Sequence, residues 1–146
     1  MTDRQRSLLD AIGAPYSWGA GDLQDALDRW PAGPFDCSGF AQACLRVLDI
    51  VQPTAWTDKS AGGLADACDP IPLDRVQLGD LAFYGEPGHI THVVVALDDH
   101  MAIGCNGGTG ATHGDNPRAC VQVRPICYRG DLVVCGRLKL RYRRIT

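Results

Sequence analysis

The sequence predicts an α+β fold in which helices come first and an antiparallel sheet of about five strands follows. Apolar residues recur at helical spacing in the first half of the chain, whereas the second half alternates runs rich in Val and Ile with turn residues. A content of 45% hydrophobic and 21% charged residues, with 17 Gly and 9 Pro, excludes a disordered, coiled-coil or collagen-like chain. At 146 residues, we expect a single domain over residues 1–146.

Four helices are expected in the first half, because apolar side chains there return every three or four positions. Their expected ranges are 2–12, 22–30, about 38–48 and 60–68. Gly13 ends the first helix, and Asp22 has the residue type that caps a helix N-terminus. The third range has the widest apolar stripe and directly follows a break rich in Pro and Gly.

Strands are expected in the second half, where β-branched residues lie between turn residues. Their expected ranges are 77–85, 90–97, 101–106, 120–127 and 131–140. At the end of the last range and beyond it, Arg137, Lys139, Arg141 and Arg143 alternate with apolar residues. We interpret this pattern as a solvated edge strand, and attraction to an anionic polymer or a partner is the alternative.

Charge and hydropathy exclude several classes of partner. A net charge of −3 gives no overall basic field, so nucleic acid is not an expected partner. No window of 18 apolar residues exists, so membrane insertion is not expected. The N-terminus lacks the features of a secretory signal, so we expect synthesis in the cytoplasm and release or delivery by other machinery.

The seven cysteines do not form a recognisable framework. Their number is odd and no C-x-x-C occurs, which argues against a full disulfide set or a zinc ribbon. The spacing of Cys105, His113, Cys120 and Cys127 matches no common metal site, so we expect neither a metal nor another cofactor. We expect most of the cysteines to be small buried hydrophobic residues.

Cys37 differs because it stands at the entry of the strongest predicted helix. Free backbone N–H groups and the helix dipole favour a thiolate there, so we expect a lowered pKa. Asp36 is a suitable cap, and His92, which begins an apolar strand, is a suitable base. The alternatives are a structural cysteine and a core histidine. His89 is the rival base, but its odd separation from His92 predicts the opposite face of the strand.

Four sequence blocks together resemble the NlpC family of papain-like cell-wall peptidases. In the family's order they are PYSWG (15–19), FDCSGF (35–40), LGDLAFY (78–84) and THVVV (91–95). The second block is similar to the nucleophile motif and the fourth to the strand that carries the base. The resemblance implies a papain-like cysteine peptidase that uses Cys37 and His92. Its substrates would be peptidoglycan stem peptides, cut beside γ-D-glutamyl or a diamino acid.

Two departures from the family pattern concern the site. The stretch between Trp18 and Cys37 is longer than usual, and the family's third residue, about 12 after the base, falls on Gly104, which has no side chain. If the hairpin loop has an odd number of residues, positions 104 and 106 face the same way as His92; if it is even, position 105 does. We favour Asn106 as the orienting group, because its amide oxygen accepts from an imidazole N–H. A backbone carbonyl is the alternative.

Two further residues are expected at the site. The match to the family implies that Tyr16 hydrogen-bonds the reacting carbonyl, and packing beside Trp18 is the alternative. Ser38 would contribute mainly its backbone N–H, or Cys37 its own, to an oxyanion.

Other functions remain open. An acyltransferase or amidase would use the same Cys/His pair, and a non-catalytic wall-binding module would explain Gly104. A phage-type lytic or tail-associated enzyme and a delivered bacterial effector both fit the expected lack of a leader, with action in the cell wall or periplasm.

Overall fold

Helices and strands follow one another in the order that the sequence predicts. The computed structural model describes residues 1–20, 22–52, 56–108, 112–114 and 116–144. Its α-helices are α1 (Asp3–Leu9), α2 (Leu23–Arg29), α3 (Cys37–Val47) and α4 (Ala61–Asp66). Three short 3₁₀ helices follow later in the chain: η2 (Leu73–Arg75), η3 (Ile126–Tyr128) and η4 (Leu140–Tyr142).

Each α-helix begins at a side-chain cap. The capping residues, whose side chains accept a backbone N–H three residues on, are Thr2, Asp22, Asp36 and Ser60. The third helix starts at Cys37, one residue earlier than expected, because the cap is Asp36. The cysteine is therefore the first helical residue.

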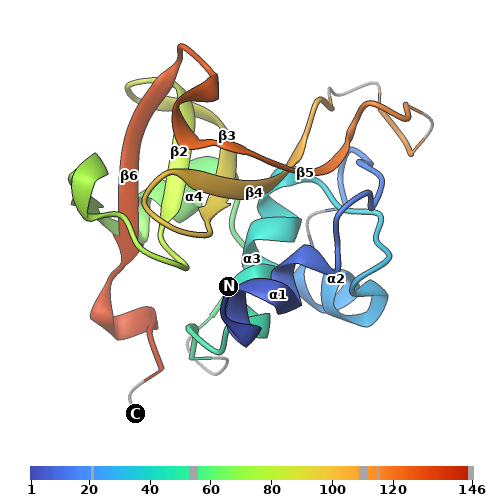
Figure 1. The fold of residues 1–146 in the computed structure, drawn as a ribbon, viewed down its shortest axis with the longest axis horizontal. Helices are drawn as coiled ribbons and strands as arrows, with labels where there is room; N and C mark the ends of the chain where they lie inside the picture. The colour runs from blue at the N-terminus through green and yellow to red at the C-terminus, as the bar shows by residue number, and fades with distance from the viewer. Residues whose placement is uncertain (21, 53–55, 109–111, 115, 145–146) are drawn as a thin grey trace.

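The described strands form one antiparallel sheet of six, against about five expected. They are β1 (Cys68–Ile71), β2 (Leu81–Glu86), β3 (His89–Ala96), β4 (Met101–Asn106), β5 (Cys120–Pro125) and β6 (Leu132–Leu138). Their order across the sheet is β1-β6-β2-β3-β4-β5. Figure 1 shows α1, α2 and α3 grouped below β4 and β5, with β6 standing beside β2.

The interpretation of the C-terminal alternation as an edge strand is wrong. β6 pairs with β1 on one side and with β2 on the other, and the alternating pattern continues into η4 rather than into more strand. Arg137 makes two hydrogen bonds to Asp80, from Nε to Oδ1 at 2.9 Å and from Nη2 to Oδ2 at 3.0 Å. Asp80 is 2% exposed, so this arginine neutralises a buried carboxylate.

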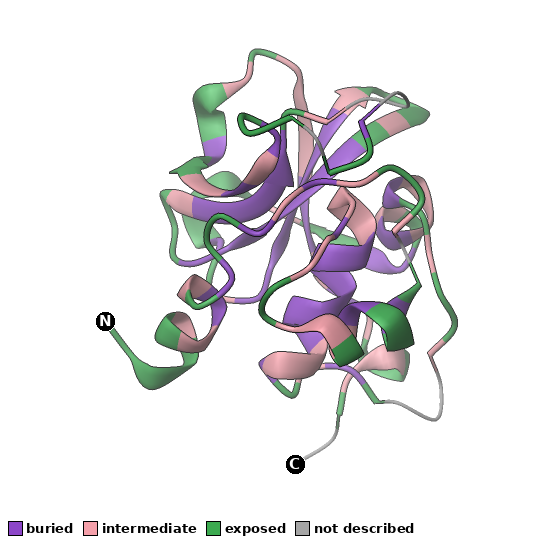
Figure 2. Ribbon diagram, turned by 90° about the vertical axis from the view of Figure 1, so that its right-hand side faces the viewer, coloured by how far each residue is buried: buried purple, intermediate pink, exposed green. Residues whose placement is uncertain are grey.

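Strand β3 lies between two apolar layers. Val93 and Val95 pack in the cluster that contains the α3 side chains, whereas Val94 and Ala96 pack on the opposite face with Tyr84. Burial on both faces explains why the strand reads as a continuous apolar run. Figure 2 shows the buried residues concentrated in the sheet and in the helices that cover it.

The β3–β4 hairpin sets which side chains of the two strands face each other. Val95 pairs with Ile103 and Ala96 with Ala102, and the same register places Asn106 opposite His92. This is the arrangement expected for a loop with an odd number of residues. Among the helices of the described residues, none has the length and apolar character needed to cross a membrane.

Candidate active site

The nucleophile candidate is held at the first turn of α3. Asp36 Oδ1 accepts the Gly39 N–H at 2.7 Å and the Ser38 hydroxyl at 3.3 Å, so the cap fixes the turn around Cys37. Among the described residues, the backbone N–H groups of Cys37 and Ser38 donate to no backbone carbonyl, and both lie beside the Cys37 sulfur. N–H groups at a helix N-terminus that have no carbonyl partner can stabilise negative charge on an oxygen that approaches the sulfur.

The thiol does not have the lowered pKa that its place in the helix predicts. Burial raises the pKa of Cys37 to about 11, and the Asp36 carboxylate acts in the same direction. The backbone N–H groups of Val93 and Ser38 act against this shift but are outweighed. The expectation of a resting thiolate is therefore wrong, because desolvation of the charged sulfur exceeds the effect of the helix N-terminus.

His92 and Asn106 meet on neighbouring strands. His92 Nε2 lies 2.6 Å from Asn106 Oδ1, and the two residues are only 8% and 5% exposed. An amide oxygen only accepts, so Nε2 carries the proton and Nδ1 is left as the acceptor. Within the described residues Nδ1 has no hydrogen bond.

The position that the family normally uses for a third residue is filled from another strand. A Cβ on Gly104 would lie 2.4 Å from Val94 Cγ1, so the valine occupies the space that a side chain would need. Asn106, two residues further along β4, directly faces His92 instead.

The His92 ring is neutral at rest. Burial lowers its pKa to about 4, the Asn106 hydrogen bond acts to raise it, and the Arg129 charge lowers it. Cys37 lies against the same strand, because the N–H of Val93, the residue after His92, interacts with its sulfur. The site thus combines a protonated thiol with a neutral, oriented imidazole.

A groove of about 600 Å³ opens over Cys37. It is lined by Tyr16 and Trp18, residues 36–38, residues 60–62 and residues 88–91. Tyr16 is 4% exposed, and burial, followed by the charges of Cys37 and Asp36, raises the pKa of its hydroxyl, which therefore stays protonated. A Cβ on Gly108 would lie 2.0 Å from the Tyr16 ring, so the glycine lets backbone cover the tyrosine.

His89 and His100 lie in surroundings that differ from those of His92. His89 lines the groove, whereas His92 is buried and is not among the residues that line it. His100 sits in the hairpin turn beside Asp99, with 3.2 Å between Nδ1 and Oδ1, and is exposed. The structure therefore brings His92, and not His89, together with Asn106.

Three residues around His92 escaped the sequence analysis. The Tyr84 ring lies 5.7 Å from the His92 ring, and the Tyr128 hydroxyl lies 3.3 Å from Asn106 Oδ1. Arg129 lies 5.3 Å from the Tyr84 ring centre and forms a two-point ion pair with Asp131. Tyr84 belongs to one of the four family-like blocks, but no pattern in the sequence points to the other two.

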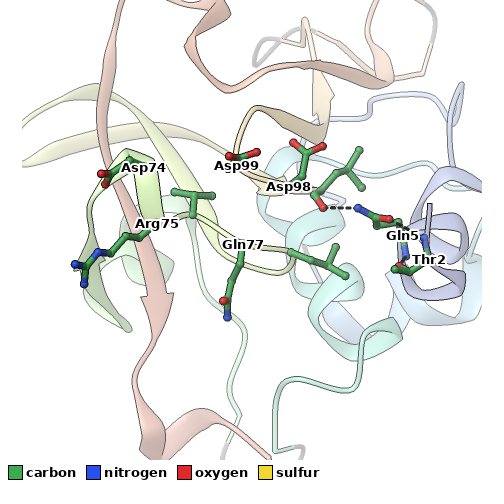
Figure 3. Close-up of a pocket in the computed structure, with 10 residues that line it drawn as sticks. Thr2, Gln5, Asp74, Arg75, Gln77, Asp98 and Asp99 are labelled. Atoms are coloured by element: carbon green, nitrogen blue, oxygen red, sulfur yellow. Dashed lines mark hydrogen bonds between the residues drawn. The ribbon is translucent and has the colours of Figure 1, made fainter.

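A second pocket, of about 510 Å³, lies away from these residues (Figure 3). Its polar groups serve local structure: Gln5 donates from Nε2 to the Leu97 carbonyl at 2.9 Å and ties α1 to the β3–β4 hairpin. Asp98 accepts two backbone N–H groups of its own turn. In the described part of the chain, no group of three or more His, Cys, Asp or Glu side chains is placed to hold a metal ion.

Comparison with known proteins decides the family. The sequence profile of the NlpC/P60 family matches residues 13–124. The chain belongs to the NlpC/P60 family. It is 31% identical over 103 residues to the peptidoglycan endopeptidase RipB of Mycobacterium tuberculosis, across 68% of this chain and 40% of RipB. It is 32% identical over 126 residues to protein P54 of Enterococcus faecium, across 84% of this chain and 20% of P54.

Solved NlpC/P60 domains share the α+β architecture. The NlpC/p60 domain of the peptidoglycan hydrolase SagA superposes with a TM-score of 0.60 at 27% identity, over 92% of this chain and 96% of that one. RipB superposes with a TM-score of 0.62 at 25% identity, over 93% and 63%. RipD of Mycobacterium tuberculosis, described as a non-catalytic NlpC/p60 domain protein, has the same fold at 17% identity, with a TM-score of 0.64 over 96% and 99%. This NlpC/P60 chain spans less than half the length of its curated relatives RipB and P54.

Proposed function

We propose that this NlpC/P60 chain is a cysteine peptidase that hydrolyses amide bonds in peptidoglycan stem peptides. The observation that carries the proposal is the 2.6 Å contact between His92 Nε2 and Asn106 Oδ1, beside a helix N-terminus that presents Cys37 to a groove. The Asn106 amide fixes the His92 proton on Nε2 and leaves Nδ1 free to accept another. A base needs this arrangement, whereas a purely structural histidine does not. The proposed bond lies beside γ-D-glutamyl or a diamino acid, as in the family.

The first half-reaction transfers the stem-peptide acyl group to the sulfur. As Cys37 Sγ attacks the carbonyl carbon, the thiol proton moves to His92 Nδ1. Because the resting pair is neutral, the sulfur loses its proton to His92 as it attacks rather than before. The carbonyl oxygen takes up negative charge, which the N–H groups of Cys37 and Ser38 and the Tyr16 hydroxyl stabilise. The C–N bond then breaks, and the His92 proton goes to the leaving amine.

The second half-reaction releases the product. Neutral His92 accepts a proton from a water molecule, whose oxygen attacks the thioester carbonyl. The C–S bond breaks, the sulfur takes the proton back from His92, and the free carboxyl product leaves. Asn106 holds the ring in the same tautomer through both steps, because its oxygen accepts the Nε2 proton throughout.

Digestion of purified peptidoglycan, followed by mass spectrometry of the soluble products, tests the proposal. We expect new stem-peptide fragments with the wild type and with Cys127→Ala, an exposed thiol, but not with Cys37→Ala. For the base, His92→Ala should abolish the fragments and His100→Ala should not. Loss of activity in His89→Ala with retention in His92→Ala would overturn the assignment of the base.

A binding module is the second candidate function. Two observations favour it: Gly104 stands where the family carries a side chain, and RipD is described as non-catalytic with an adaptation to peptidoglycan binding. Wild-type protein that sediments with peptidoglycan but releases no fragments, under conditions where the Cys37→Ala variant sediments equally, would support this function instead. Release or delivery by phage or secretion machinery stays a prediction.

A further inference from the structure

Asn106 has a second hydrogen-bond partner besides His92. Its Oδ1 accepts from the Tyr128 hydroxyl at 3.3 Å as well as from His92 Nε2 at 2.6 Å. A side-chain amide can rotate so that its NH₂ group takes the place of its oxygen. In that orientation the amide NH₂ would donate to Nε2, and the ring proton would move to Nδ1. Nδ1 could then no longer accept the Cys37 proton. The Tyr128 hydroxyl donates to this oxygen, and a phenol is a stronger donor than acceptor, so it favours the orientation that leaves Nδ1 free.

Tyr128 is itself fixed on the face of the sheet that carries His92. Its ring lies 6.1 Å from Tyr84, whose ring in turn lies 5.7 Å from His92. The Tyr84 hydroxyl donates to the Ile126 carbonyl at 2.6 Å, so the 3₁₀ helix η3 that contains Ile126 and Tyr128 is anchored to the strand. Tyr84, His92, Asn106 and Tyr128 therefore form a closed ring of contacts.

Tyr128 lies outside the groove, and this separates its role from substrate binding. The residues that line the space above Cys37 come from other segments, and η3 contributes none of them. Its side chain is 36% exposed, so loss of the hydroxyl leaves no buried group unpaired except the second acceptor site of Asn106. A change at this hydroxyl should therefore affect turnover rather than substrate affinity.

We propose that Tyr128 is a positioning residue for the peptidase, which acts through Asn106 to hold His92 in the tautomer that accepts the Cys37 proton. The inference rests on the proposed function. Tyr128→Phe keeps the ring contact with Tyr84 and removes one neutral hydrogen bond. We expect kcat to fall about three- to tenfold, the effect of one such bond, with KM unchanged.

A double-mutant cycle tests whether the hydroxyl acts through Asn106. In the Asn106→Ala background, Tyr128→Phe should leave kcat unchanged, because the acceptor of the hydroxyl is already gone. An equal loss in both backgrounds, or a rise in KM in place of the fall in kcat, would overturn the proposal. Tyr142→Phe is the matched control, since this tyrosine lies in η4 near the end of the chain and contacts Trp56.

A second readout does not depend on activity. Nitrogen-15 NMR of the imidazole should show His92 protonated at Nε2 in the wild type and a mixture of tautomers in Tyr128→Phe. If the wild type releases no peptide but this shift occurs, the proposed peptidase fails and the positioning role stands. If the tautomer of His92 is the same in both proteins, Tyr128 does not position it.

Discussion

Gly104→Ala should destabilise the sheet although it adds only one methyl group. The new Cβ would lie 2.4 Å from Val94 Cγ1 and 3.0 Å from Val94 Cβ, so rotation of the valine about χ1 does not remove the clash. Overpacking of this kind costs about 1–3 kcal/mol, and the loss of unfolded-state freedom at glycine offsets about 0.5 kcal/mol. We therefore expect a net loss of about 1–2 kcal/mol in the free energy of unfolding.

The same contact predicts that a second substitution restores stability. Val94→Ala alone deletes two methyl groups from a buried side chain and should cost about 2 kcal/mol. The double variant Val94→Ala/Gly104→Ala should be about 1–2 kcal/mol more stable than the sum of the two single effects, because each change creates the space that the other needs. Its peptidase activity should also exceed that of Gly104→Ala, whose Cβ would lie 3.3 Å from Asn106 Oδ1.

Urea unfolding followed by tryptophan fluorescence measures these differences. Gly130→Ala is the matched control, because a Cβ there meets nothing within 4 Å and should leave stability unchanged or slightly raised. Strict additivity of the two substitutions, or a Gly104→Ala variant as stable as Gly130→Ala, would refute the argument that Val94 fills the family's usual position.

Three further predictions concern charge. Burial lowers the pKa of His92 from 6.5 to about 4, so on acidification the unfolded chain binds a proton at this residue before the folded chain does. About 3 kcal/mol of unfolding free energy should therefore be lost as pH falls from 6.5 through 4. Urea unfolding of His92→Gln should show a flatter pH dependence. With a pKa of about 11, Cys37 should react with iodoacetamide at pH 7 more slowly than the exposed Cys127 of the same molecule, and faster labelling of Cys37 by peptide mass mapping would contradict a buried neutral thiol. Arg137→Met leaves a buried carboxylate unpaired and should cost about 2 kcal/mol of unfolding free energy, whereas Arg144→Met breaks an exposed pair and should cost almost nothing.

Local patterns were sufficient to predict the helices and most of the strands. The caps that begin α2 and α3 are single residues with a direct role, so Asp22 and Asp36 marked both starts to within one residue. β1 was not predicted, because its four residues include Asp69 and Pro70 and lack the β-branched run that marks a strand. Its pairing depends on β6, which lies more than sixty residues later in the chain.

The candidate site shows the same division between local and distant information. Strand parity limited the orienting group to positions 104–106, and the amide oxygen of Asn106 decided the choice; the hairpin that aligns this residue with His92 is local. Tyr128 had no such signal, since it reaches Asn106 from η3 after a different strand. The predicted direction of the Cys37 pKa shift was wrong for a related reason. The helix N-terminus is visible in the sequence, whereas the burial that outweighs it is a property of the assembled fold.

The place of β6 in the sheet has a consequence for biosynthesis. This strand is translated last of the six, yet β1 has no other neighbour and β2 would keep an open edge without it. A nascent chain that has not yet emerged past residue 138 therefore cannot close its sheet, and η3, just before β6, emerges only shortly earlier. Cys37, the proposed nucleophile, therefore lacks the complete sheet until residue 138 has emerged, so the order of synthesis itself delays the appearance of the finished site.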